Sequence, residues 1–163
     1  MTAAGYQLAQ VNIGRLMAPI DAPEIREFVE NLERINALAV SQPGFVWRLV
    51  GEGGDATDIR AFDNPLVAIN MSVWDSVEHL AAFVYRTAHR DIMRRRREWF
   101  HAMETYMALW WVPAGERPTP AEARDRLETL QRLRATPRAF TFRQPFPSPG
   151  VSTAPAPILE DCA

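Results

Sequence analysis

The sequence predicts an α+β protein with a ferredoxin-like fold, in which elements follow the order β-α-β-β-α-β and a further helix extends the C-terminus. The first observation is Leu66–Trp74, where alternate residues are apolar and the intervening set carries an amide, a hydroxyl and an indole. A strand sends these sets to opposite faces, so one face belongs to a core and the other to a cavity wall or an interface. The second observation is a helical repeat of apolar residues from Ile25 to Ala39. The third is the order in which strand-like and helix-like segments follow one another along the chain.

The first half of the chain shows a clear signal for each element. Tyr6–Leu16 alternates apolar residues with Gln and Asn, which predicts the first strand. Asp21 is predicted to cap the first helix, which has a proline in its first turn. Phe45–Val50 is rich in aromatic and branched residues and predicts the second strand, and Gly51–Pro65 predicts a flexible connection.

The second half is predicted from the same signals. A third strand at Leu66–Trp74 is followed by a helix that is capped by Asp75 or Ser76 and ends near Arg86. Thr87 then opens a helix over Ala88–Met103, and Tyr106–Val112 is the fourth strand. A helix capped by Thr119 ends near Leu133, and Ala139–Phe142 forms a short strand. Prolines and small residues then dominate, which is unsuited to a core. We therefore expect one domain over residues 1–143 and a proline-rich, flexible tail over residues 144–163.

The predicted topology also leads to an expected assembly. The first and third strands lie at the centre of a ferredoxin-like sheet, and right-handed crossovers place both helices on one face. If the apolar sets lie under the helices, the polar sets, together with Trp74, lie on a bare face. Pairing two such faces would bury them, which predicts a homodimer formed through the sheet face.

Composition limits the classes of function. The 163 residues are 47% hydrophobic with a net charge of −2, which is typical of a globular protein and gives no electrostatic reason to expect nucleic acid. We see neither a signal peptide nor an apolar run long enough to span a membrane, and the single cysteine, Cys162, forms no intrachain disulfide. We therefore expect no membrane partner and a cytoplasmic location.

Familiar catalytic motifs are absent from the sequence. We find no phosphate-binding glycine loop, dinucleotide fingerprint, His-Glu-x-x-His, paired cysteine motif or Gly-x-Ser-x-Gly elbow. The three histidines form no recognisable metal set. Nothing therefore identifies a hydrolase, a kinase or a zinc enzyme, and neither a metal nor a cofactor is expected.

Polar residues on the two central strands form the first candidate site. They are Gln10, Asn12, Asn70 and Ser72. Side chains of this kind on adjacent strands can hydrogen-bond a carbonyl, hydroxyl or amide group of a ligand. The alternative is that they bond to one another or to ordered water, as buried polar groups generally do.

A stripe on the predicted helix Ala88–Met103 forms the second candidate site. Its members, spaced four, three, four and three residues apart, are His89, Met93, Arg96, Phe100 and Met103. His89 is suited to general acid–base chemistry or to binding a metal or haem, and Arg96 to holding a carboxylate or an oxyanion. The alternatives are a capping or core histidine and an arginine in an ordinary ion pair.

Aromatic residues form the third candidate site, because they can line a pocket for a flat apolar ligand. The members predicted to bind the substrate are Trp47, Trp74, Trp99, Phe100 and Trp110. Ordinary packing in the core or in an interface is the alternative for each of them. Trp110 and Trp111 are neighbours on one strand, so at most one of them faces a cavity.

Five pieces of the chain resemble the bacterial family known as domain of unknown function 3291. They are LAQVNIGRLMAPID, INALAVSQPGFVWRL, AFDNPLVAINMSVWDSVEHLAAFVYRTAHRDIMRRRREWF, LWWVPAGERPTPAEARDRLETL and TPRAFTFRQPF. The resemblance covers nearly all of Tyr6–Phe146, with only the tail outside it. It implies a dimeric α/β-barrel fold related to the antibiotic-biosynthesis monooxygenases, whose superfamily includes cofactor-free oxygenases, haem-degrading enzymes, haem-binding dehydratases, isomerases and lactone-forming enzymes. No catalytic motif of the family transfers to this chain residue by residue.

Two classes of function follow from these observations. The first is a cofactor-free enzyme of small-molecule, secondary metabolism that acts on an apolar or aromatic substrate in a cavity between the sheet and the helices, as the resemblance implies, by proton transfer, oxygenation, isomerisation or cyclisation. In it, Asn12 and Asn70 hold a substrate oxygen with help from Gln10 and Ser72, His89 moves a proton, and Arg96 supports charge; if haem were bound instead, His89 would be its ligand. The second is a non-catalytic dimeric protein that binds a small ligand, with haem among the candidates.

Overall fold

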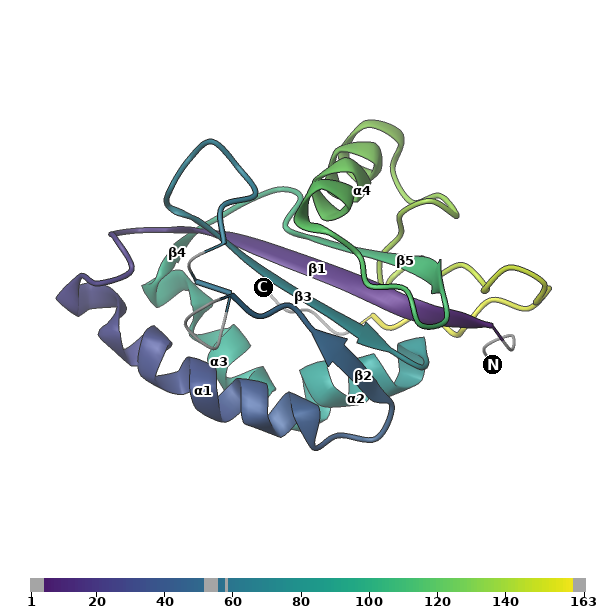
Figure 1. Cartoon of the computed structure of the whole chain (residues 1–163), viewed down its shortest axis with the longest axis horizontal. Helices are drawn as coiled ribbons and strands as arrows, with labels where there is room; N and C mark the ends of the chain where they lie inside the picture. The colour runs from purple at the N-terminus through teal and green to yellow at the C-terminus, as the bar shows by residue number, and fades with distance from the viewer. Residues whose placement is uncertain (1–4, 52–55, 58, 160–163) are drawn as a thin grey trace.

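The computed structural model describes residues 5–51, 56–57 and 59–159, which form a five-stranded sheet with helices on both faces (Figure 1). β1 (Tyr6–Leu16) and β3 (Val67–Trp74) pair along their lengths at the centre. β2 (Phe45–Arg48) pairs with β3, and β5 (Met107–Pro113) pairs with the first part of β1. All pairings between the described strands are antiparallel, and the neighbour order β5-β1-β3-β2 confirms the predicted ferredoxin-like arrangement.

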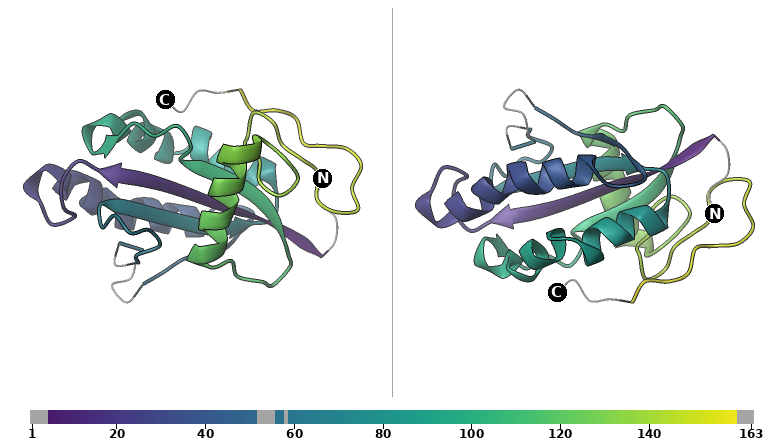
Figure 2. Two further views of the ribbon diagram at one scale, coloured as in Figure 1. Left: turned by 90° about the horizontal axis from the view of Figure 1, so that it is seen from above. Right: turned by 90° about the horizontal axis from the view of Figure 1, so that it is seen from below.

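The helices are divided between the two faces of the sheet. α1 (Arg26–Val40), α2 (Val77–Arg86) and α3 (His89–Arg94) lie together on one face, and α4 (Pro120–Leu133) crosses the strands on the other, as Figure 2 shows. Ser76 caps α2 and Thr119 caps α4 through their hydroxyl oxygens, as predicted. No helix in the described part of the chain is long and apolar enough to cross a membrane.

The predicted assignment of the sheet faces was wrong. Val11 and Met71 belong to the apolar set, are fully buried, and form a core with Trp110 of β5 and Leu127 of α4. The polar set therefore faces α1, α2 and α3, because the apolar stripe of α4 takes the purely apolar side of the sheet. The homodimer was predicted from a sheet face left bare by the helices. Because α4 covers the apolar face, that face gives no reason for two sheets to pair, and the homodimer stays a prediction.

The start of α1 also differs from its predicted form. Asp21 does not cap it; the chain enters through a 3₁₀ turn at Pro23–Ile25 whose N-terminal residue, Ala22, makes no side-chain cap. Proline at the first position of that turn agrees with the sequence signal. The helix itself begins at Arg26 and follows the predicted apolar stripe.

The long helix predicted over Ala88–Met103 is not formed. α3 ends at Arg94, a 3₁₀ turn follows at Arg96–Glu98, and Phe100–His101 forms the short strand β4. β4 pairs with the end of β1, and Met17 N donates to Trp99 O at 2.8 Å. Pairing with the sheet edge thus takes the backbone groups that a continuing helix would use, which helical periodicity cannot reveal.

The described part of the tail, residues 144–159, lies against β5. Trp111 Nε1 donates to Phe146 O at 3.0 Å, and Ile158 N donates to Phe142 O at 2.7 Å. Ser148 is buried. This segment therefore adds to the core near β5, contrary to the expectation that it is unsuited to one, while the flexibility of residues 144–163 stays a prediction.

Candidate functional site

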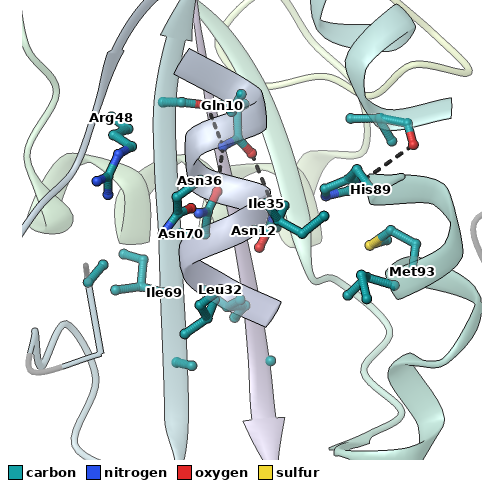
Figure 3. A pocket seen from close by; sticks show the side chains of 18 of the residues that line it. Gln10, Asn12, Leu32, Ile35, Asn36, Arg48, Ile69, Asn70, His89 and Met93 are labelled. Atoms are coloured by element: carbon teal, nitrogen blue, oxygen red, sulfur yellow. Dashed lines mark hydrogen bonds between the residues drawn. The ribbon is translucent and has the colours of Figure 1, made fainter. Parts of the chain in front are cut away.

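A cavity of about 170 Å³ lies between the polar side of the sheet and helices α1, α2 and α3 (Figure 3). Pockets for drug-sized ligands span roughly 300–1,000 Å³, whereas an apolar cavity of about 150 Å³ accepts benzene. The cavity is therefore suited to a ligand with one aromatic ring and small substituents.

Most of the predicted site residues line this cavity, although they come from separate parts of the chain. They are Gln10 and Asn12 from β1, Asn70 and Ser72 from β3, His89 from α3, Arg96 and Trp99 in and after the following 3₁₀ turn, and Phe100 from β4. The helical stripe proposed for His89 to Met103 is not one helix, but His89, Arg96 and Phe100 still meet at the cavity because the chain turns there toward the sheet.

The amide residues form a hydrogen-bonded row across the two central strands. Gln10 Nε2 donates to Asn70 Oδ1 at 2.9 Å and to Ser72 Oγ at 2.8 Å. Asn12 Nδ2 lies 3.5 Å from Gln10 Oε1. Both N–H groups of Gln10 are therefore used within the protein, which is the predicted alternative of mutual bonding.

Asn70 retains a free donor in this row. Its oxygen accepts from Gln10, whereas its Nδ2 has no hydrogen-bond acceptor among the described residues. Asn70 lies on the wall of the cavity, which Asn36 of α1 also lines (Figure 3). The N–H groups of Asn70 are consequently available to a ligand oxygen.

His89 is held by backbone groups at the start of α3. Its Nδ1 lies 3.3 Å from Val84 O, a carbonyl that can only accept, so Nδ1 carries the hydrogen and Nε2 keeps its lone pair. Thr87 Oγ1 accepts from the His89 backbone N–H at 3.2 Å and fixes the turn. Burial lowers the pKa of His89 below its usual 6.5, and the bond to Val84 opposes this shift. His89 is therefore neutral at pH 7 and can accept a proton.

Aromatic residues close the end of the cavity near β4. Trp99 is buried and tilted against Phe28 of α1, with ring centroids 5.6 Å apart. Phe100 meets Phe28 edge to face at 4.9 Å. Arg96 lies over the Tyr106 ring, with its Cζ 4.1 Å from the centroid.

Three tryptophans that were predicted to bind substrate do not line the cavity. Trp74 is fully buried, stacks on Phe83 with centroids 5.4 Å apart, and donates through Nε1 to Ser72 Oγ at 2.8 Å. Trp47 and Trp110 pack in the core on the α4 side. Trp74 therefore supports the polar row from the position next to Ser72 on the same face of β3, and none of the three lines the cavity as predicted.

Neither member of the Trp110–Trp111 pair faces the cavity. Trp110 Nε1 donates to Glu122 Oε1 of α4 at 3.2 Å. Trp111 lies on the other side of β5, where its ring is 6.4 Å from that of Phe140. The two side chains do point to opposite faces, as predicted, and both are used in packing.

Several polar cavity residues were missed from the sequence, among them Asn36 and Arg48. Asn36 interrupts the apolar stripe of α1, and this polar residue in a stripe was the available signal. Arg48 had no such signal, because β2 contains a register shift between Phe45 and Trp47. That irregularity turns Trp47 toward the α4 side, while Arg48 pairs with Ser72 at the cavity.

A close contact at Gly14 gives a first testable prediction. A Cβ at this position would overlap the ring of Phe100, so we expect Gly14→Ala to lower the free energy of unfolding by about 1–3 kcal/mol. Urea titration measures this loss. Gly14→Ala should cost less stability in a Phe100→Leu background than in the wild-type protein, because the ring that it overlaps is gone. Strictly additive losses in the double variant would show that the Phe100 ring is not the obstacle.

The cavity does not fit a haem group. His89 has the free ring nitrogen that iron ligation requires. However, the volume of about 170 Å³ lies below the range for drug-sized ligands, and a haem macrocycle is larger than most of these. No group of three or more His, Cys, Asp or Glu side chains suited to a metal ion occurs among the residues that the structure describes.

A family model described as domain of unknown function (DUF3291) matches residues 7–156. The chain belongs to the DUF3291 family. The DUF3291 match extends past Phe146 and includes most of the proline-rich tail, so the expectation that the tail lies outside the family was wrong. A search of the curated proteins finds no match to this chain.

Two solved structures are similar to this DUF3291 chain at low identity. One is a protein of unknown function from Nitrosomonas europaea, with a TM-score of 0.46 and 11% identity over 73% of this chain and 99% of that chain. The other is a candidate antibiotic biosynthesis monooxygenase from Chloroflexus aurantiacus, with a TM-score of 0.42 and 16% identity over 71% of this chain and 99% of that chain. Likeness at this level leaves the activity of the chain open.

Proposed function

We propose that this protein is a cofactor-free enzyme of small-molecule metabolism that removes a proton from an apolar or aromatic substrate bound in the cavity. One observation carries the proposal: a neutral histidine and free amide N–H groups line the same small cavity, whose other walls are mostly apolar. A base and a donor for a developing negative charge are the two groups that abstraction of a proton next to a carbonyl requires.

The proposed step uses only side chains of this chain. The substrate carbonyl oxygen accepts a hydrogen bond from Asn70 Nδ2, and Asn12 supplies a second amide beside it. His89 Nε2 takes the proton from the adjacent carbon; the C–H bond breaks, an N–H bond forms, and the electron pair moves onto the oxygen. The resulting imidazolium keeps its Nδ1–H bond to Val84 O.

Three outcomes share this first step. Return of the proton at another carbon gives isomerisation, attack of the enolate on a carbonyl in the same molecule gives cyclisation, and electron transfer to O₂ gives oxygenation. The apolar walls favour each of them because they exclude water from the anion; they include Leu32 and Ile35 of α1 and Phe83 of α2. A homodimer, a cytoplasmic location and a role in secondary metabolism remain parts of the same proposal.

The second candidate is a non-catalytic protein that binds a small ligand. The hydrogen bonds that Gln10 and Trp74 make to Ser72 favour it, because they satisfy most of the polar row without a substrate. Binding of a ligand without any proton exchange would identify this alternative.

Deuterium exchange tests the enzyme proposal. The protein is incubated in D₂O with acetophenone and with phenylpyruvate, and proton NMR follows deuterium entry next to the carbonyl. We expect exchange above the protein-free rate, and a loss of about 10²–10³-fold in Asn70→Ala, because one donor to the oxyanion is removed.

Asn64→Ala is the matched control for this experiment. Asn64 is exposed, and its side chain accepts from the backbone N–H of Leu66 at 2.9 Å. It should keep the wild-type exchange rate. No exchange with either compound, or equal rates in the two variants, would contradict the proposal.

A further inference from the structure

The charges around the cavity differ from those of the chain as a whole. The chain carries 20 acidic and 18 basic residues, with a net charge of −2. The described residues that line the cavity include Arg48 and Arg96 but no aspartate or glutamate. Among the described residues, the only formal charges on the cavity lining are therefore positive, although the protein as a whole is slightly acidic.

Arg96 is the decisive cation because it has no acidic partner among the described residues. Arg96 is half-buried, and its guanidinium lies over the face of the Tyr106 ring. This contact leaves the five N–H donors of Arg96 without a hydrogen-bond acceptor among the described residues. The preceding residue shows the usual arrangement: Arg95 pairs with Glu27 and with Glu98, each at 2.7 Å. Arg48 has contacts of its own, so the inference rests on Arg96 alone.

An unpaired guanidinium at a largely apolar cavity favours the binding of an anion. Removing such a charge from water is costly unless an opposite charge and hydrogen-bond acceptors replace the water. A carboxylate supplies both, since its two oxygens match the planar N–H fork of arginine. The volume of about 170 Å³ leaves room for one ring beside that carboxylate.

We propose that the natural ligand of the cavity is a small aromatic or apolar carboxylate anion, with its carboxylate on Arg96. This inference rests on the proposed functional site and narrows its substrate class from apolar molecules in general to apolar acids. The oxygen that Asn70 holds is then a second oxygen of the same ligand, away from the carboxylate.

Benzoate and benzamide provide the test because they have the same shape and differ in charge. Isothermal titration calorimetry should show that the wild-type protein binds benzoate about 10–100-fold more tightly than benzamide, as expected for charge-assisted hydrogen bonds.

Arg96→Gln should remove this preference by weakening benzoate binding alone. Arg97→Gln, an exposed arginine one residue away, is the matched control and should bind benzoate like the wild type. Arg96→Lys keeps the charge without the planar fork and should retain part of the preference.

Salt dependence keeps the proposal testable if Arg96→Gln fails to fold. Raising the salt concentration from about 0.02 M to 0.5 M should weaken benzoate binding to the wild type and leave benzamide binding unchanged. Equal affinities for the two compounds, no binding of benzoate, or a preference that survives in Arg96→Gln would overturn the inference. Benzoate has no exchangeable C–H next to its carboxyl group, so its binding is independent of proton transfer. Charge-selective binding without deuterium exchange would therefore refute the proposed reaction alone.

Discussion

Trp74→Ala should lower the free energy of unfolding by about 3–5 kcal/mol, the range for removing a large buried aromatic side chain. Trp74 is fully buried, stacks on Phe83, and meets Phe45 edge to face with centroids 5.5 Å apart. Its removal leaves a void next to the polar row, on the same face of β3, and takes a donor from Ser72 Oγ. Urea denaturation followed by circular dichroism measures the loss.

Two further variants separate the contributions of Trp74. Trp74→Phe keeps a ring but lacks the indole N–H, so we expect a smaller loss of about 1–2 kcal/mol. Trp110→Ala removes an equally buried tryptophan on the α4 side and should destabilise the protein to a similar extent. Only the Trp74 variants should change benzoate affinity, because Ser72 supports the row that lines the cavity. A Trp74→Ala protein as stable as the wild type would contradict this account of the core.

The order of the fold could be predicted because it depends on local signals. Alternation in Tyr6–Leu16 and Leu66–Trp74 marks the two central strands, and Ser76 and Thr119 mark the starts of two helices. Each of these signals lies within a few residues of the element that it specifies. The strand order then follows from the connection rules of this topology.

The features that could not be predicted depend on contacts between residues far apart in the sequence. The assignment of the sheet faces depended on α4, about 50 residues beyond β3, which takes the apolar side. The early end of α3 depended on pairing of Phe100 with Leu16. Arg48 entered the site through a register shift in β2. The candidate residues His89, Asn70 and Arg96 were nonetheless found, since each is a polar group in an otherwise apolar pattern.

His89→Gln should reduce the deuterium exchange rate by about 10²–10⁴-fold, the usual contribution of a general base. Glutamine preserves a polar group of similar length but accepts no proton at neutral pH. His101→Gln is the matched control, because His101 is exposed on β4 and does not line the cavity. It should exchange at the wild-type rate, whereas a His89→Gln protein with undiminished activity would remove His89 from the mechanism.

The pH dependence gives the same residue an independent test with a defined sign. Burial holds the pKa of His89 below 6.5, so the unfolded state binds a proton at a pH where the folded state does not. The stability of the wild-type protein should therefore fall as the pH drops below about 6.5 and continue to fall to the folded-state pKa. His89→Gln should lack this part of the loss in urea titrations between about pH 7.5 and 5. The exchange rate, which needs neutral His89, should decline as the pH falls with a midpoint below pH 6.5, and a midpoint above 6.5 would contradict a buried neutral base.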